Sequence, residues 1–219
     1  MKNKVINIGI ALLFIVGLTL IFINPIRDAL LKRSAKELSL EHYTAEQLKE
    51  NEQQQDVDFT FEAVQSLSLT DVLKAQASSK DYPVIGSIVV PSVNMEVPIL
   101  KGVANSALAV GAGTMKPDQK LGIGNYALAA HYFEGRDVLF GPLYNATIGD
   151  SVYVTDLDKV YEYRINHKET IAATDVHVIN DTPGQTKLTL ITCADAGYNR
   201  LAVEAEFVEA IPFDEMPLK

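Results

Sequence analysis

The stretch that decides the fold lies near the C-terminus and reads KLTLITCADAGYNRLAVEAEFV, from Lys187 to Val208. Polar and apolar residues alternate along both of its halves, and this period of two is typical of β-strands. Between the halves, residues 194–199 include a glycine and an asparagine, which favour a hairpin loop. We therefore expect two paired strands, Lys187–Thr192 and Leu201–Val208.

The preceding hundred or so residues contain further short β-branched runs, which Gly, Pro and Asn interrupt. The predicted strands are Ile85–Val90, Met95–Ile99, Asn125–His131, Ser151–Thr155, Val160–His167 and Glu169–Ala173. Strands at this short spacing indicate an all-β barrel or sandwich and argue against a parallel α/β sheet.

Composition excludes several other classes. The 219 residues carry a net charge of −9, and this acidic balance argues against nucleic acid as a partner. A single cysteine excludes a disulfide framework and any zinc site built on two or more cysteines. No HExxH-like histidine pair and no phosphate-binding GK[ST] loop occurs.

The N-terminal segment differs from the rest in charge and hydropathy. Up to Lys36 there are six basic residues and one acidic residue, whereas the remainder holds 13 basic and 27 acidic residues. The run Val5–Ile23 has no charged residue and is close to the length that spans a bilayer. An uncleaved anchor is favoured over a cleaved signal peptide or a buried core helix.

These boundaries predict four parts. Residues 1–4 form a short cytoplasmic tail, 5–24 a transmembrane signal-anchor helix, 25–80 a helical stalk and 81–219 the β-rich domain. Basic residues flank the apolar run on both sides, so charge alone does not decide its orientation. We expect the N-terminus in the cytoplasm and the body outside, because long domains are translocated regardless of charge.

Two candidate catalytic residues lie at the predicted hairpin. Alternation places Cys193 and Arg200 at the facing ends of two paired strands, so they should be neighbours. A free cysteine is more often a small buried hydrophobic residue, but here a fixed cation beside it would stabilise a thiolate or an oxyanion. His131 ends a predicted strand before a loop and is the candidate proton shuttle. His167 and His177 fit structural or solvated positions better.

Three motifs together identify a family resemblance. They are Leu128-Ala129-Ala130-His131, Thr189-Leu190-Ile191-Thr192-Cys193, and an arginine that begins the following strand. With Ile88–Pro91 and Val97–Gly102, they resemble a class A sortase, a membrane-anchored cysteine transpeptidase of Gram-positive bacteria. The resemblance covers the region from Tyr82 to Val208 and the N-terminal anchor.

The resemblance implies an eight-stranded β-barrel and a reaction. Cys193 would attack the Thr–Gly bond of an LPxTG-type sorting signal to form a thioacyl enzyme. His131 would move the protons, and Arg200 would hold the oxyanion and peptide carbonyls. An amine of a lipid II-type cell-wall precursor would then resolve the thioester and anchor the surface protein to peptidoglycan.

The resemblance also suggests a substrate groove and a cofactor requirement. Matching positions make Ala129, Val176, Ile179, Thr189 and Ile191 candidates for the wall that binds the Leu-Pro part of the signal. Some relatives bind calcium in the loop before the histidine strand. Here residues 112–124 offer only Asp118, beside Lys116 and Lys120, so no cofactor, metal or calcium dependence is expected.

Two other classes of protein remain open at this point. An L,D-transpeptidase or a cell-wall cysteine peptidase also uses Cys and His on a β-rich body, although the motif and residue order differ. A non-catalytic, membrane-tethered adhesion or sensor module would leave Cys193 unreactive and Arg200 exchangeable.

Overall fold

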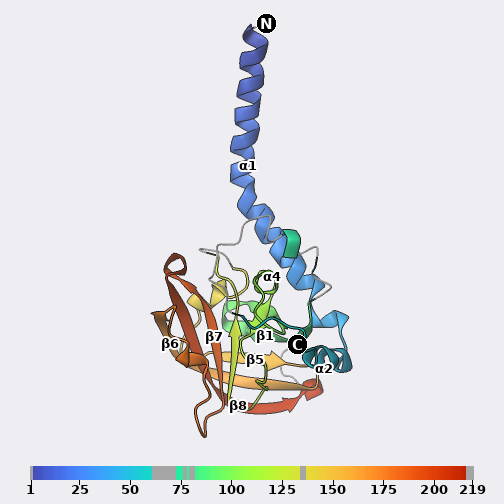
Figure 1. The fold of residues 1–219 in the computed structure, drawn as a ribbon, viewed down its shortest axis with the longest axis vertical. Coiled ribbons are helices and arrows are strands. Elements are labelled where there is room, and N and C mark those ends of the chain that lie inside the picture. Colours follow the sequence, from blue (N-terminus) through green and yellow to red (C-terminus); the bar gives the residue numbers. More distant parts are fainter. Residues whose placement is uncertain (1, 61–72, 76–77, 79–81, 134–136, 216–219) are drawn as a thin grey trace.

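The computed structural model describes residues 2–60, 73–75, 78, 82–133 and 137–215. Figure 1 shows a β-barrel, with the long N-terminal helix α1 leading away from it. The predicted stalk, 25–80, falls partly outside the described residues, at 61–72, 76–77 and 79–80.

Eight strands form a closed barrel in the order β1-β2-β3-β4-β7-β8-β6-β5. This architecture confirms the mainly β prediction and the barrel that the resemblance implies. The strands are β1 (Val84–Val90), β2 (Met95–Leu100), β3 (Ala112–Thr114), β4 (Asn125–Ala129), β5 (Ser151–Thr155), β6 (Lys159–Ala172), β7 (Lys187–Ala194) and β8 (Asn199–Pro212). The β2–β3 and β4–β7 pairs are parallel, and the remaining pairs are antiparallel.

Two strand predictions were wrong in detail. The runs Val160–His167 and Glu169–Ala173 form one strand, β6, because a register shift between Ile165 and His167 breaks the alternation without ending the strand. The short strand β3 was missed, because Ala112-Gly113-Thr114 has little intrinsic strand preference. It forms where β2 and β4 pair with it on either side.

The barrel interior holds the apolar side of each strand. Leu188 and Leu190 of β7 and Val203 and Ala205 of β8 are fully buried, as their alternation predicts. Tyr163 is also fully buried, and its hydroxyl accepts a hydrogen bond from the Gly122 backbone N–H at 3.1 Å. Ile191 and Cys193 lie on the opposite face of β7.

One long helix, two short helices and several 3-10 turns accompany the strands in the described residues. The helices are α1 (Lys2–Glu37), α2 (Ala45–Glu52) and α4 (Asn105–Leu108), with 3-10 turns η1 (Leu40–His42), η3 (Pro91–Val93), η4 (Gly141–Tyr144), η5 (His177–Ile179), η6 (Asp195–Gly197) and η7 (Phe213–Glu215). Thr44 caps α2 in a reciprocal capping box with Gln47. Leu31 of α1 and Leu38, which directly follows the helix, are buried, so the end of that helix packs on the body.

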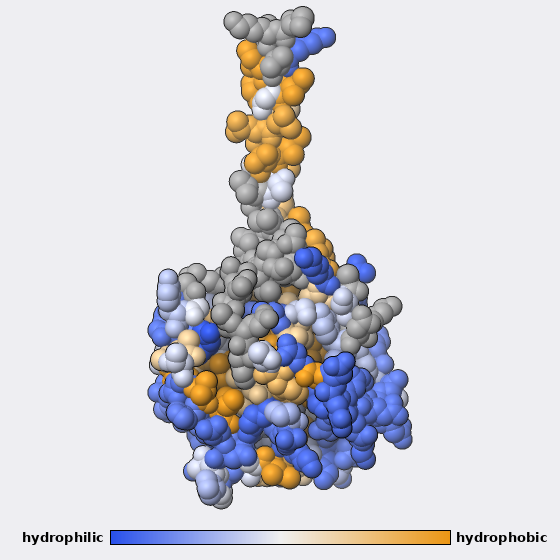
Figure 2. Space-filling view, viewed as in Figure 1, coloured by the Kyte–Doolittle hydropathy of each residue, from blue (hydrophilic) through white to orange (hydrophobic). Residues whose placement is uncertain are grey.

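The projecting part of α1 is apolar on its surface, in contrast to the largely hydrophilic barrel (Figure 2). Its exposed large hydrophobic residues are Ile6, Ile8, Ile10, Leu12, Leu13, Phe14, Ile15, Val16, Leu18, Phe22 and Ile26. Judged over the described residues alone, none of the helices reaches the combined length and hydropathy needed to cross a membrane.

Candidate active site

Cys193 and Arg200 face each other across the β7–β8 pair, which confirms that they are neighbours. The η6 turn joins the two strands directly beyond them. Arg200 is the second residue of β8, and its Nη1 donates to the backbone oxygens of Gly197 and Asn199, both at 2.8 Å. The guanidinium therefore holds the hairpin loop next to the thiol.

His131 reaches the same cavity from just beyond β4, which ends at Ala129 and not at His131 as predicted. That strand runs parallel to β7, with Ala129 opposite Ile191. Beyond this pair, the Ala130 N–H donates to the Ile191 oxygen at 3.2 Å, and the Thr192 hydroxyl donates to the Ala130 oxygen at 2.7 Å. These two bonds join the chain just before His131 to the chain just before Cys193, residues that are far apart in sequence.

A cavity of about 570 Å³ joins the three predicted catalytic residues to an apolar wall. Its lining includes His131, Cys193 and Arg200, together with four of the five predicted groove residues: Ala129, Val176, Ile179 and Ile191. Val103, Leu108, Met115, Ile171 and Val178 complete much of the apolar surface. The sequence prediction missed these residues because they come from separate segments of the chain, including α4, β6 and η5, with no pattern that links them to β7.

Thr189 does not line the cavity, which corrects its place among the groove residues. It is fully buried, and its hydroxyl donates to Asn125 Oδ1 at 2.7 Å. Alternation put Thr189 on the same face as Ile191 and Cys193, but at this end of β7 that face is covered. Thr189 therefore belongs to the support beneath the groove.

Burial keeps the imidazole of His131 uncharged. The residue is 6% exposed, and Nε2 has no hydrogen-bond partner within the part of the chain that the structure describes. Desolvation lowers the pKa of His131 to about 4, although a hydrogen bond to the Asn105 backbone opposes the effect. At neutral pH the ring is neutral, with a nitrogen free to accept a proton.

The thiol is neutral for the same reason. Burial raises the pKa of Cys193, and the nearby Arg200 charge only partly offsets this effect. The resting pair is therefore a thiol and an imidazole, which the sequence alone left undecided. The Arg200 charge would favour a thiolate at this position.

Two tyrosines lie behind the nucleophile and were not predicted. The Tyr144 hydroxyl donates to the Cys193 carbonyl oxygen at 2.9 Å. The ring of Tyr132 packs on that of Tyr144 with centroids 4.5 Å apart. This contact fixes the backbone of Cys193 where β7 ends.

The remaining histidines of the body lie outside the cavity lining. His167 of β6 is about half exposed and lies 3.2 Å from a Glu169 carboxylate oxygen. His177 of η5 is exposed and contacts the Asn180 side chain. Over the described ranges, no three His, Cys, Asp or Glu residues are grouped closely enough to hold a metal ion.

A thiol, a proton-accepting imidazole and a guanidinium around one apolar cavity are the groups that a cysteine transpeptidase uses. Comparison with known proteins agrees with this class. The model of the sortase domain matches residues 88–208, more than half of the chain. The chain belongs to the sortase family and is a cell-wall sorting cysteine transpeptidase.

Several relatives are class A members of the family. Sortase A of Streptococcus agalactiae is 39% identical, over 96% of this chain and 88% of that protein. Sortase A of Listeria monocytogenes is 40% identical, over 83% of this chain and 81% of that protein. The solved structure of the Listeria enzyme superposes with a TM-score of 0.57, covering 59% of this chain and 90% of that one. These similarities do not favour the L,D-transpeptidase, peptidase or non-catalytic readings.

Proposed function

We propose that the enzyme cleaves the Thr–Gly bond of LPxTG-type sorting signals and passes the threonyl group to a cell-wall amine. The observation that carries this proposal is the shared cavity, where Cys193, His131 and Arg200 meet the apolar residues Val176 and Ile191. An apolar wall suits the Leu-Pro part of a signal, and the polar end suits its scissile bond.

In the first half-reaction, the Cys193 thiol proton moves to Nε2 of His131, and Sγ attacks the threonyl carbonyl carbon. The imidazolium then donates that proton to the glycine nitrogen, the C–N bond breaks, and a thioester remains on Cys193. In the second half-reaction, an amine attacks the thioester carbonyl carbon, and His131 accepts the proton of that amine. His131 then returns the proton to the Cys193 sulfur as the C–S bond breaks, and the new amide leaves. Atoms and charge balance over the cycle, and no cofactor is consumed.

Arg200 stabilises the negative charge in both half-reactions. Its guanidinium cannot act as a base, so its contribution is electrostatic. Nη1 already donates to two loop carbonyls, which fixes the orientation of the group before substrate arrives. The other N–H groups of the planar guanidinium supply donors for the oxyanion or a peptide carbonyl.

Replacing Arg200 with alanine should lower kcat/KM for a sorting peptide by about 100- to 1,000-fold, because one fixed charge donor to the oxyanion is lost. Arg200→Lys should recover part of the rate, since it keeps the charge but not the planar fork. The matched control is Arg164→Ala on β6, whose exposed side chain pairs with Glu162 and does not line the cavity. Equal losses of kcat/KM in Arg164→Ala and Arg200→Ala would contradict the role of Arg200 in stabilising the oxyanion.

We also propose that α1 anchors the enzyme in the membrane, with the N-terminus in the cytoplasm and the barrel outside. The exposed apolar side chains of α1 support this placement, because in water they would be unfavourably hydrated. Its partners would be LPxTG-bearing surface proteins and a lipid II-type precursor. Alkaline extraction of membranes should leave the full chain in the pellet, whereas release into the supernatant would contradict the anchor.

We propose further that activity does not require calcium. Lys116, in the loop before β4, lies 2.6 Å from the Asp181 carboxylate, in the segment before β7. The hydrogen bond from Lys116, together with that from the Asn125 N–H, lowers the pKa of Asp181. A lysine ammonium thus bridges two loops, and its positive charge opposes binding of a second cation there.

A calcium chelator should leave the rate of peptide cleavage unchanged. Lys116→Ala should raise KM by about 3-fold, because a partly exposed ion pair contributes roughly 1 kcal/mol or less. Added calcium should not restore the variant. The measurement is initial rate against peptide concentration with and without chelator, and a chelator-sensitive rate that calcium restores would overturn the proposal.

The test of the proposed function is the identity of the cleavage products. The full 219-residue chain, in detergent micelles, should convert an LPxTG peptide into a fragment that ends in threonine. A peptide with the same residues in scrambled order is the matched control. An intact LPxTG peptide after incubation with folded enzyme would overturn the assigned sorting signal.

A further inference from the structure

The segment between β6 and β7, residues 173–186, forms one side of the cavity but belongs to neither strand. Val176, Val178 and Ile179 contribute its apolar lining. Within it, the only regular structure described is the 3-10 turn η5. A wall of this kind needs other contacts to hold it against the barrel.

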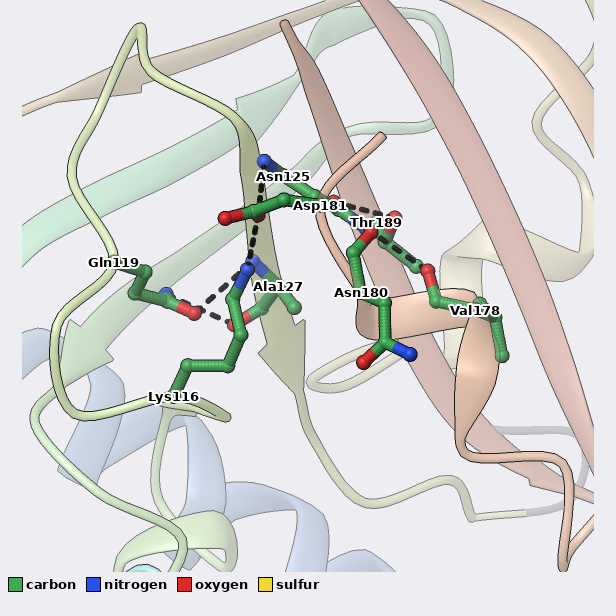
Figure 3. A network of polar contacts seen from close by, with 8 residues as sticks. All are labelled: Lys116, Gln119, Asn125, Ala127, Val178, Asn180, Asp181 and Thr189. Carbon is green, nitrogen blue, oxygen red and sulfur yellow. Dashed lines mark hydrogen bonds and ion pairs between the residues drawn. The ribbon is translucent and has the colours of Figure 1, made fainter. Parts of the chain in front are cut away.

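Asn125, at the start of β4, supplies those contacts, and its side chain points toward Val178 and Asn180 (Figure 3). Its side chain is fully buried. Nδ2 donates to the backbone oxygen of Val178 at 2.9 Å and to that of Asn180 at 3.2 Å. These two carbonyls bracket Ile179, so one amide fixes the backbone on both sides of a cavity residue.

Thr189 fixes the orientation of that amide. Its hydroxyl donates to Asn125 Oδ1 at 2.7 Å, which leaves Nδ2 facing the wall. Two carbonyl oxygens can only accept, so the opposite orientation of the amide would place oxygen against oxygen. Asn125, Thr189 and the wall carbonyls therefore form a network with one arrangement of donors and acceptors.

The Asn125 backbone also forms a hydrogen bond with the same segment. Its N–H donates to Asp181 Oδ1 at 2.9 Å, and Lys116 Nζ contacts the same oxygen at 2.6 Å. Gly124 makes this approach possible: it has φ +60°, and a Cβ there would lie 2.9 Å from Asp181 Oδ1.

We propose that Asn125 is a positioning residue for peptide binding. Its hydrogen bonds fix the distance between the η5 wall and Ile191 on the other side of the groove. The proposal rests on the proposed function. Asn125 acts on the peptide through the wall and does not touch the reacting atoms. β4 and β7 are already joined by backbone pairing, whereas the two wall carbonyls receive side-chain donors from Asn125.

The decisive variant is Asn125→Asp. Aspartate has nearly the same shape and still accepts from Thr189. In its ionised form it cannot donate to either wall carbonyl, and in its protonated form it can donate to only one. We expect KM for the LPxTG peptide to rise by about 10-fold, because at least one of the two hydrogen bonds is lost and a buried carbonyl is left unpaired, with kcat within about 3-fold of wild type. The rate of Cys193 alkylation by iodoacetamide should not change, because the catalytic groups stay in place.

The matched pair at Thr189 gives a second measurement if Asn125→Asp folds poorly. Thr189→Ser keeps the hydroxyl and should behave as wild type. Thr189→Val keeps the volume but frees the amide, so KM should rise by about 3-fold. Unchanged KM in both Asn125→Asp and Thr189→Val would overturn the proposal. So would a proportional fall of kcat, alkylation rate and melting temperature, which indicates a role in stability alone.

Amide hydrogen exchange separates this proposal from the proposed function. Exchange within residues 173–186 of the full chain in micelles should be at least about 10-fold faster in Asn125→Asp, while the strands of the barrel keep their protection. Equal exchange in variant and wild type would overturn the positioning role, whatever peptide the enzyme accepts. Failure of wild type to cleave the peptide would overturn only the assigned sorting signal.

Discussion

Replacing Cys193 with alanine should abolish cleavage of an LPxTG peptide, lowering kcat/KM by at least about 10,000-fold. The reason is that Cys193 is the only cysteine in the chain, and in the proposed mechanism its sulfur forms the thioester that stores the acyl group. The measurement is cleavage of a fluorogenic peptide by the full chain in micelles. The alanine side chain lies in the same half-buried position, so the fold should be retained.

The control for this prediction is binding without turnover. Because the apolar wall at Val176 and Ile191 is untouched, Cys193→Ala should still bind the peptide with a Kd similar to that of wild type. Fluorescence polarisation of a labelled peptide measures this directly. Residual cleavage above about 1% of the wild-type rate would show that another group is the nucleophile.

His131→Ala should lower kcat/KM by about 1,000- to 10,000-fold, because in the proposed mechanism the imidazole of His131 takes the thiol proton and protonates the leaving amine. His167→Ala, which removes a histidine outside the cavity lining, is the matched control and should retain the wild-type rate. A comparable loss in both variants would point to a general effect of removing an imidazole and would contradict the assignment.

The pH profile of the wild-type enzyme tests the same residue in another way. Burial lowers the pKa of His131 to about 4 and raises that of Cys193. Because its pKa is lowered, the imidazole of His131 stays neutral to a lower pH than an ordinary histidine. Because its pKa is raised, the thiol of Cys193 keeps its proton to a higher pH than an ordinary cysteine. The acid limb of kcat/KM should therefore lie below pH 6.5, roughly the ordinary imidazole value, and the alkaline limb above about 8.5.

Sequence was sufficient where local periodicity decided the geometry. Alternation along β7 and β8 predicted that Cys193 would face Arg200, and the hairpin register confirms it. The same alternation places Leu190 and Val203 on the faces opposite Cys193 and Arg200, and both are fully buried. In an antiparallel hairpin these positions follow from a period of two and a short loop.

Contacts between distant segments were not accessible in this way. β3 exists through pairing with its neighbours, and no local pattern shows that Asn125 lies beneath the wall of a cavity. Thr189 was misplaced because alternation gives the face of a strand but not what covers that face. The neutral state of Cys193 and His131 depends on burial, which only the assembled barrel defines.

The measurement that tests the central claim most directly is the intact mass of the enzyme during turnover. The full chain is mixed with an LPxTG peptide, sampled before and after addition of triglycine, and analysed by mass spectrometry. The account predicts an adduct of the N-terminal peptide fragment on Cys193, which disappears on addition of the amine as a ligated peptide forms. Product formation without any adduct on Cys193, or an adduct that triglycine does not remove, would contradict transpeptidation through a thioester.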